Sequence, residues 1–166
     1  MKAAIQVIQH EGLIRSIALP PDFTPSPASA DADSDLFRFW YSSWFSGCPG
    51  PVSPEWFDWS ELSVFQSSIL QALQKVPFGK VLSYKQLAVL AGHPRSIRAV
   101  ASVLALNPFP LVYPCHRVIY SDLRCGVYSR IPDNPVKKRI LLREGVVFTT
   151  EDLVSSVSVW DGVDGR

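Results

Sequence analysis

A cysteine beside a histidine is the first feature of this sequence that could carry out chemistry. Cys115 and His116 follow Pro114, directly after the apolar segment 109–113. A thiolate is a strong nucleophile, and a thiol needs a neighbouring base or positive charge to ionise near neutral pH. Adjacent residues of an extended strand point to opposite faces, so His116 can reach Cys115 only where the chain turns or through a bridging water. Taken alone the pair is weak evidence, because most such cysteines are simply buried thiols.

The composition is that of a folded protein. The 166 residues suffice for one ordinary domain or two small ones that share a core, and the 47% apolar and 19% charged content excludes a disordered chain. The sequence contains no run of about 18 apolar residues, so it predicts no membrane span. The amino terminus lacks a basic region followed by an apolar core, so we expect no signal peptide.

The cysteines indicate a compartment. Cys48, Cys115 and Cys125 are an odd, scattered set that matches neither a metal-ligand pattern nor a disulfide framework. We therefore expect no bound metal and a reducing intracellular location, either cytoplasmic or nuclear.

The net charge of +1 conceals an uneven distribution. Residues 1–78 carry four basic and eight acidic side chains, whereas residues 79–144 carry eleven basic and three acidic ones, and residues 145–166 return to −3. Basic residues scattered over a solvated face are the ordinary explanation. The surplus coincides with the segment that holds Cys115, however, which favours a polyanion such as nucleic acid as the partner.

The amino-terminal third predicts a small sheet element and a loop. Residues 3–9 and 13–19 alternate apolar and polar side chains, which is typical of a hairpin with one buried face. From Pro20 to Ala32 the sequence is rich in Pro, Ser, Ala and Asp and predicts a linker.

A helix is expected over residues 35–45, capped by Asp33 or Ser34. This segment is rich in aromatic residues. They could form a platform for nucleic-acid bases, but packing in the core is the more common role of such side chains.

The rest of the chain predicts four more helices. One starts at Ser60 or Glu61 and buries a stripe at helical spacing, made of Phe65, Ile69, Leu73 and Val76. Ser83 and Gln86 form a capping box for a short helix that stops at Gly92. A helix from about Arg95 to Leu106 follows, and the last one, Val136–Glu144, is capped by Asn134-Pro135. For the acidic segment after Phe148, the pattern leaves a short strand and a frayed end as alternatives.

The two middle helices form a helix-turn-helix pattern, whose second helix usually enters a DNA groove. Here that helix offers small side chains and no Asn, Gln or Lys to read base edges, with Arg98 alone near its start. Small residues permit close approach to a minor groove, as in binding driven by DNA shape. A buried helix is the alternative, and half of the helix must be buried in any case.

Several spaced motifs together identify a family. They are Ser83-Tyr84-Lys85-Gln86, Arg98-Ala99-Val100-Ala101, Asn107-Pro108, Pro114-Cys115-His116-Arg117, Gly126-Val127-Tyr128-Ser129 and Leu141-Leu142-Arg143-Glu144-Gly145. In this order and spacing, residues from about Phe65 to Gly145, roughly half of the chain, resemble the alkylguanine-DNA alkyltransferases, also called methylated-DNA–protein-cysteine methyltransferases.

The resemblance implies a role for each matched residue of the reaction. Cys115 accepts the alkyl group from 6-O-alkylguanine, once per molecule, while His116 takes the thiol proton through a water. Glu144 orients the imidazole, Asn107 holds the turn around the cysteine, and Tyr84 donates to the leaving guanine. Cofactors are not needed.

The resemblance also implies how DNA is held. Arg98 fills the space left by the extruded nucleotide, Tyr84 pushes the target phosphate round, and Ala99, Ala101 and Ser102 line the minor-groove face. The extruded base enters a pocket lined by Tyr84, Tyr128 and Ser129. Extrusion is physically required, because a thiol cannot reach the substituent inside the base stack.

The fold implied is α+β. A small ribonuclease H-like sheet domain over residues 1–60 precedes a winged-helix-like helical domain over residues 61–148, and residues 149–166 form an acidic tail. The expected state is a monomer bound to double-stranded DNA that contains 6-O-alkylguanine.

Departures from the family pattern lie near the expected base pocket. Leu123 stands where the family has glycine, residues 130–133 replace a glycine-rich segment, and about two extra residues precede the last helix. The zinc ligands of some members have no counterpart. Tolerance of large alkyl groups is therefore open.

Three rival functions remain at this stage. A non-catalytic alkyltransferase-like protein lacks the reactive cysteine, which is present here. A helix-turn-helix transcriptional regulator would need a dimer helix or a second DNA-binding segment, and neither is visible. A cysteine hydrolase would need direct contact between Cys115 and His116, against which strand alternation argues.

Overall fold

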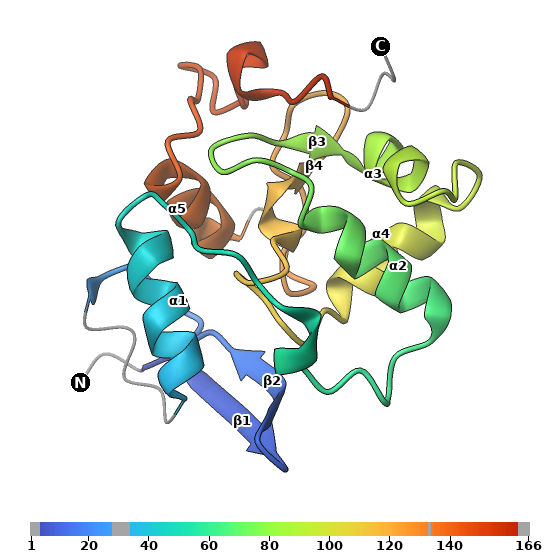
Figure 1. The fold of residues 1–166 in the computed structure, drawn as a ribbon. Coiled ribbons are helices and arrows are strands. Elements are labelled where there is room, and N and C mark those ends of the chain that lie inside the picture. Colours follow the sequence, from blue (N-terminus) through green and yellow to red (C-terminus); the bar gives the residue numbers. More distant parts are fainter. Residues whose placement is uncertain (1–3, 28–33, 133, 163–166) are drawn as a thin grey trace.

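The computed structural model describes residues 4–27, 34–132 and 134–162. These described residues form an α+β fold with two small sheets and five α-helices. Figure 1 shows the hairpin and α1 at one end of the molecule and helices α2, α3 and α4 at the other, with β4 and α5 between them. One cluster of buried side chains, from Ile5 to Ile140, runs through both ends, so the amino-terminal elements share a core with the rest.

The amino-terminal hairpin is confirmed. Strands β1 (Gln6–His10) and β2 (Leu13–Ala18) pair antiparallel, with a bulge between Ile8 and Gln9. β2 buries Ile14 and Ile17, which are three residues apart, so strict alternation does not account for the burial of both; the register shifts between Ser16 and Ile14. The first residue of the expected strand and residues 28–32 of the expected linker lie outside the described residues.

Helix α1 (Asp35–Phe45) has the bounds that the sequence predicts. The Ser34 hydroxyl accepts a hydrogen bond from the Phe37 amide, which satisfies one of the free donors at the helix start; the alternative cap, Asp33, lies outside the described residues. The helix buries its aromatic face, which consists of Phe37, Trp40, Tyr41 and Trp44, and leaves Phe39 exposed. Core packing, and not a platform for bases, explains most of this aromatic segment.

The start predicted for the next helix is wrong. Helix α2 (Val64–Leu73) begins three to four residues later than Ser60 or Glu61. The physical reason is a capping box: the Ser63 hydroxyl accepts from the Gln66 amide, and the Gln66 side chain accepts from the Ser63 amide. The short 3₁₀-helix η2 (Pro54–Trp56) precedes it.

The helix-turn-helix pattern is present as α3 (Tyr84–Leu90) and α4 (Ile97–Ala105). Ser83 and Gln86 form the predicted capping box of α3. α4 is shorter than expected by two residues at its start and one at its end. Its buried face consists of Val100, Val103 and Leu104, so a third of its nine residues is core, less than the half predicted.

Sequence reasoning missed one pairing that matters for the site. Strand β3 (Leu82–Ser83) pairs parallel with β4 (Val118–Ile119), so the residue before α3 lies beside the segment that follows Cys115. The 3₁₀-helix η3 (Cys115–Arg117) leads directly into β4. This pairing brings two distant motifs of the sequence together.

The last helix and the tail pack onto this centre. Helix α5 (Pro135–Arg143) is capped by Asn134, whose side chain accepts from the Val136 amide, and it begins one residue before the predicted start. After α5 the chain forms the 3₁₀-helix η4 (Ser156–Ser158). The next residue, Val159, then forms a parallel β-bridge with Val81. Val154 is fully buried, so the described part of the tail is packed and not frayed.

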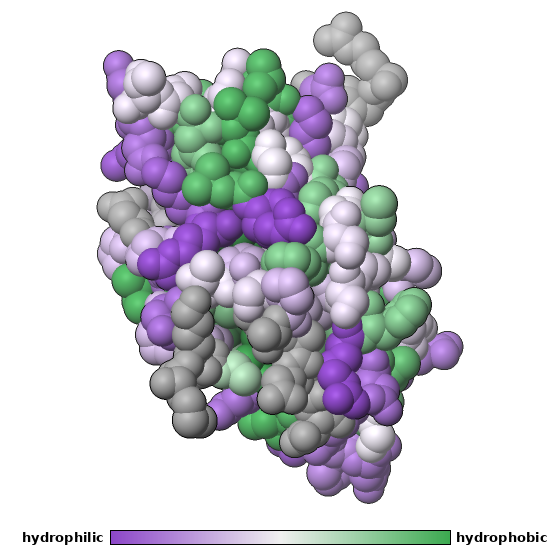
Figure 2. Space-filling model, turned by 90° about the vertical axis from the view of Figure 1, so that its left-hand side faces the viewer, coloured by the Kyte–Doolittle hydropathy of each residue, from purple (hydrophilic) through white to green (hydrophobic). Residues whose placement is uncertain are grey.

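The outer face of α5 and the tail is mixed in character. Leu142, Val147 and Val157 are all at least half exposed there. Figure 2 shows hydrophobic side chains in the upper part of this face above a band of hydrophilic ones. Within the described residues, none of the helices has the length and apolar character needed to cross a membrane.

Candidate active site

The turn at Cys115 answers the geometric question that the sequence posed. Cys115 opens η3 directly after Pro114, so strand alternation does not apply at this position. Cys115 and His116 are both buried. The imidazole bonds to Glu144, with Nε2 2.9 Å from Oε1, and its Nδ1 atom is buried with no partner among the described residues. The nucleophile therefore has a neighbouring imidazole whose second nitrogen is free to take a proton.

Asn107 fixes the sulfur. Its Nδ2 atom donates to the Tyr113 carbonyl at 2.8 Å and to Cys115 Sγ at 3.1 Å, while its Oδ1 atom accepts from the Phe109 amide at 2.9 Å. Asn107 is the second residue after α4, so the end of that helix is tied to the turn that carries the thiol.

Burial makes the thiol a poor acid by itself. It raises the pKa of Cys115, although the Asn107 hydrogen bond, the Lys137 charge and nearby backbone amides act in the other direction. A thiol of raised pKa stays protonated at neutral pH, so a base must remove its proton before it can act as a nucleophile.

His116 suits that task. Burial lowers its pKa, against the pull of Glu144, so the ring is neutral at pH 7. Because the ionised Glu144 accepts from Nε2, the proton of the neutral ring sits there and Nδ1 keeps its lone pair. The carboxylate thus selects the tautomer that can accept a proton on the unpartnered side.

Glu144 is the most heavily bonded group of the site. It lies at the C-cap of α5 and accepts from His116, from Arg117 twice (2.7 and 2.8 Å) and from Trp44 Nε1 (2.8 Å). Burial opposes its ionisation, but His116 and Arg117 outweigh that effect and hold the pKa of Glu144 well below its usual range. The carboxylate is a fixed negative charge behind the imidazole.

Sequence reasoning missed three residues of this network: Trp44, Arg117 and Lys137. Arg117 is buried and also donates to the Val76 carbonyl at 2.7 Å. The Lys137 ammonium is buried on α5, donates to the Val118 carbonyl at 2.6 Å, and burial lowers its pKa to about 8. The sequence could have indicated that Lys137 is buried, because helical spacing puts it on the same face of α5 as Ile140 and Leu141. No sequence pattern indicates the contact of Trp44 with Glu144, which is one hundred residues away.

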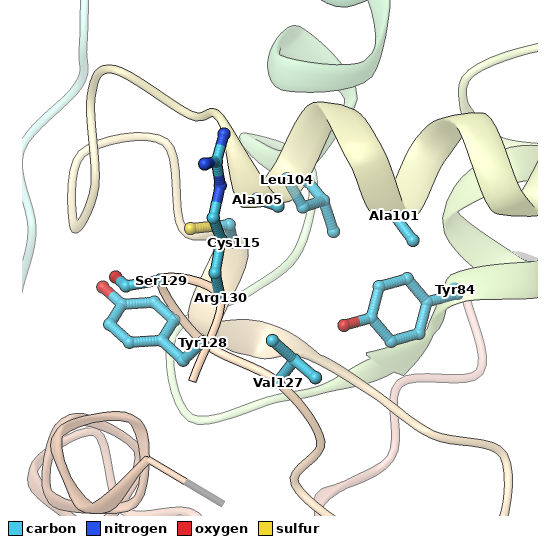
Figure 3. Close-up of a pocket in the computed structure, with 9 residues that line it drawn as sticks. All are labelled: Tyr84, Ala101, Leu104, Ala105, Cys115, Val127, Tyr128, Ser129 and Arg130. Carbon is cyan, nitrogen blue, oxygen red and sulfur yellow. The ribbon is translucent and has the colours of Figure 1, made fainter. Parts of the chain in front are cut away.

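A small cavity opens on the thiol (Figure 3). It has about 30 Å³ of free space, and its walls come from α3, α4 and the turn after β4. All three residues predicted to line the base pocket, Tyr84, Tyr128 and Ser129, line it together with Cys115. In Figure 3 the Tyr84 hydroxyl points across the cavity toward the side where the sulfur lies.

Both tyrosines of this cavity are hydroxyl donors at neutral pH. Burial, with Tyr120 and Cys115 adding to it, raises the pKa of Tyr84 to about 12. Burial likewise raises the pKa of Tyr128 well above its usual range, and its hydroxyl is without a hydrogen-bond partner in the described structure.

The turn at Ser129-Arg130 departs from what its residues prefer. Tyr128 and Ile131 exchange backbone hydrogen bonds of 3.0 and 2.9 Å, so only two residues close the turn. Ser129 and Arg130 have φ of 50° and 65°, in the left-handed region where glycine is favoured. The turn sets the Arg130 side chain at the rim of the cavity, beside the sulfur in Figure 3.

Four of the five residues predicted to contact DNA lie on α4, and the fifth, Tyr84, is the first residue of α3. Arg98, Ala99 and Ser102 are exposed, whereas Ala101 is half-buried and lines the cavity with Cys115. The Ser102 hydroxyl donates to the Arg98 carbonyl at 3.2 Å, so it is committed to its own helix. The exposed side of α4 thus presents small groups and one arginine next to the mouth of the cavity.

Metal-ligating clusters are not found in the described part of the chain, where no three His, Cys, Asp or Glu side chains gather. The site therefore consists of a thiol, an imidazole, a carboxylate, and hydroxyl and amide donors.

Comparison with known proteins gives one family. Residues 64–146 match the model described as 6-O-methylguanine DNA methyltransferase, DNA binding domain. The methylated-DNA–protein-cysteine methyltransferase of Rattus norvegicus is 46% identical over 83 residues, which are 49% of this chain and 39% of that protein. The protein of the same name from Methanothermobacter thermautotrophicus is 39% identical over 100 residues, 60% of this chain and 54% of that one. The chain thus spans about half or less of the length of these relatives.

Solved structures share the fold over most of the chain. A Mycobacterium tuberculosis alkyltransferase crystallised in complex with DNA has a TM-score of 0.63 at 24% identity, covering 84% of this chain and 85% of that one. The O6-methylguanine-DNA methyltransferase of Pyrococcus kodakaraensis has a TM-score of 0.62, also at 24% identity, covering 86% and 90%. At this identity the similarity concerns the fold.

Proposed function

This chain belongs to the family of the 6-O-methylguanine DNA methyltransferases, and we propose that it repairs DNA by moving the alkyl group of 6-O-alkylguanine onto Cys115. The observation that carries the proposal is the buried arrangement of Cys115, His116 and Glu144 at the bottom of a cavity beside α4. The family match alone does not name the nucleophile, and the geometry supports Cys115.

The proposed reaction is a single displacement. His116 Nδ1 takes the thiol proton through a bridging water, and the sulfur attacks the alkyl carbon. The carbon–oxygen bond breaks, its electron pair passes to guanine, and the proton that left the thiol ends on guanine, with Tyr84 as the hydrogen-bond donor that relays it. The products are an alkyl cysteine thioether and unmodified guanine. A thioether is a poor leaving group, so each molecule acts once.

Each positioning residue has a task in this scheme. Glu144 holds the imidazole in the accepting tautomer, and Asn107 holds the sulfur through the 3.1 Å contact. Tyr128 and Ser129 surround the base. These roles follow from the resemblance of the sequence to the family, and the contacts of Glu144 and Asn107 support two of them.

DNA is proposed to dock on the exposed side of α4. The surplus of basic residues in residues 79–144 provides the attraction, and Ala99 with Ser102 allows close approach to a minor groove. Arg98 is proposed to occupy the space that the extruded nucleotide leaves. Binding of this kind is salt-dependent and nearly independent of sequence, since the helix carries few groups that read bases.

The proposal extends to organisation. We take residues 1–60 as a ribonuclease H-like domain, residues 61–148 as a winged-helix-like domain that binds DNA and accepts the alkyl group, and residues 149–166 as an acidic tail. The protein is proposed to act as an intracellular monomer. The presence of Cys115 disfavours a non-catalytic damage-recognition role.

The test is transfer from DNA to protein. Incubation with a duplex that contains 6-O-methylguanine should raise the intact mass by one methyl group, and Cys115→Ser should show no gain. An unchanged mass for the natural protein, with the modified base intact in the DNA, refutes the proposal.

A further inference from the structure

A second, larger hollow lies beside the Cys115 cavity. It has about 410 Å³ of free space, more than ten times that of the cavity at the thiol. Tyr84, Ala101 and Val127 line both, so the two spaces share a wall. We call the larger one the outer groove; it lies between the start of α3, the start of α4 and the segment after β4.

The cavity at the thiol is the tighter of the two spaces, with about 30 Å³ of free space. A nucleobase therefore enters this cavity less readily than the outer groove. The outer groove, in contrast, has room for a nucleotide without any rearrangement.

The floor of the outer groove is aromatic. Tyr120 follows β4 as Tyr84 follows β3, and the parallel pairing of the two strands sets the rings together, with centroids 5.7 Å apart. Tyr120 as a residue is 38% exposed, and its ring packs closely over Gly126, where an added Cβ would meet it at 3.0 Å. The Arg124 guanidinium lies 5.6 Å from its ring centroid. The ring is thus held in place where it lines the outer groove.

The rim of the outer groove is positive. Lys85 and Arg98 line it with exposed side chains, and neither forms an ion pair within the described residues. An apolar, aromatic hollow edged by free cations is the arrangement that binds unstacked nucleotides: bases stack on the rings and phosphates meet the cations.

We propose that the outer groove is the first binding site of the extruded nucleotide, which stacks its base on Tyr120 before the base passes Tyr84 into the Cys115 cavity. The inference rests on the proposed function and adds a step to it. Tyr120 acts in this step on binding, ahead of the chemistry. The residue is then a determinant of how well damaged nucleotides are captured, separate from how fast Cys115 reacts.

Single-turnover kinetics can separate the two stages. With 6-O-methylguanine in a duplex and as the free nucleoside, the protein concentration that gives half-maximal rate should rise about tenfold in Tyr120→Ala, because stacking on one aromatic side chain is lost. Tyr120→Phe keeps the ring and should stay within about twofold of the natural protein. A loss confined to the duplex, or no loss, overturns the inference.

Tyr120→Ala also removes the ring that contacts Tyr84, so a second variant is needed that blocks the outer groove and keeps this contact. Ile97→Trp, on the opposite wall, fills the groove and leaves the contact between Tyr84 and Tyr120 untouched; it should weaken capture of both substrates by a similar factor. Unchanged capture by Ile97→Trp contradicts the inference.

A variant that binds but cannot transfer the methyl group tests the outer groove separately from the proposed function. In Cys115→Ser, titration with 6-O-methyl-2′-deoxyguanosine should shift the amide resonances of Tyr120, Ser121 and Ile97 at lower concentrations than those of Tyr128 and Ser129. The reverse order, or no shift at the groove, refutes the outer site. Failure of methyl transfer by the natural protein would instead refute the proposed function.

Discussion

The matched region, residues 64–146, and the residues before it serve the site in different ways. The matched region supplies the thiol, the imidazole and the carboxylate. The region before it carries no recognisable motif, yet Trp44 of α1 donates to Glu144 at 2.8 Å, and Phe45 packs under the Arg143 guanidinium at 4.2 Å. The chemistry thus lies in one region, while part of the support for its carboxylate comes from the other.

The difference between the two regions shows that family resemblance is informative about the matched segment and not about the contacts that α1 makes with it. A match over half of the chain shows the family and covers the segment in which Cys115, His116 and Glu144 lie. The supporting contacts from α1 depend on how two distant segments pack, and short motifs do not encode such packing. The predictions below test each region in turn.

The largest effect is expected for Glu144→Gln, within the matched region. The change leaves Arg117 buried without its counter-charge. It also replaces one carboxylate oxygen by an NH2 group, which donates, so Glu144's bonds to His116, Arg117 and Trp44 cannot all be kept. We expect the free energy of unfolding to fall by about 3–5 kcal/mol and transfer to be nearly lost. Urea denaturation and single-turnover rates measure the two effects. Glu151→Gln, an exposed acid of the tail, is the control, and a stable Glu144→Gln with the natural rate contradicts the account.

Acid should slow the reaction next most strongly. The pKa of His116 in the folded protein lies below its ordinary value of 6.5, so the transfer rate should hold between pH 8 and 6.5 and fall only in more acidic solution. The free energy of unfolding should also fall in acid. Below about pH 6.5 the unfolded chain binds a proton at His116 more readily than the folded protein does, and in more acidic solution the same holds for Glu144. Rates and thermal unfolding between pH 8 and 4.5 check this. A rate that increases in acid excludes a neutral imidazole base.

Trp44→Phe tests the contribution of the other region. It removes one donor to a buried carboxylate, which should cost about 1.5–3 kcal/mol of unfolding free energy. With one donor fewer, Glu144 attracts the imidazolium proton more strongly, so the acid limb of the rate profile should move to higher pH.

Trp40→Phe is the matched control for Trp44→Phe. Trp40 is a buried neighbour on the same helix face, stacked at 6.4 Å from Trp44, and its Nε1 atom has no hydrogen-bond partner in the described structure. Trp40→Phe removes the same indole group without removing a hydrogen bond to Glu144, so the dependence of the transfer rate on pH should not shift. Equal shifts in both variants would mean that α1 only fills space.

The smallest effect is expected at Arg130, where this chain departs from its family. Arg130 stands at the rim of the Cys115 cavity in a turn with positive φ. Arg130→Gly relieves the backbone and widens the opening, so the rate with a benzylated free base should rise by more than the rate with methylated DNA. If neither rate changes, the side chain lies in solvent and does not limit substrate size.

Much of the local structure was predictable from the sequence, because it depends on residues that are close together in the chain. Caps at Ser34, Ser83 and Asn134 are decided by neighbouring residues, so they were predictable. The cap at Ser63 carries the same Ser-x-x-Gln signal and was overlooked, which misplaced the start of α2.

What the sequence could not give depends on contacts between distant segments. The pairing of β3 with β4 involves two residues on each strand, too few to leave a pattern. The bridge between Val81 and Val159 has the same limitation, and it decides that the tail is packed. Arg117 was counted among the basic residues of a surface, whereas the fold buries it against Glu144.

The most direct test of the central claim is the number and position of methyl groups on the protein after reaction with excess 6-O-methylguanine DNA. Peptide mass analysis should find one methyl per molecule at the plateau, on Cys115, with Cys48 and Cys125 unmodified. A plateau above one, repeated turnover by one molecule, or a methyl group on another residue would contradict the account.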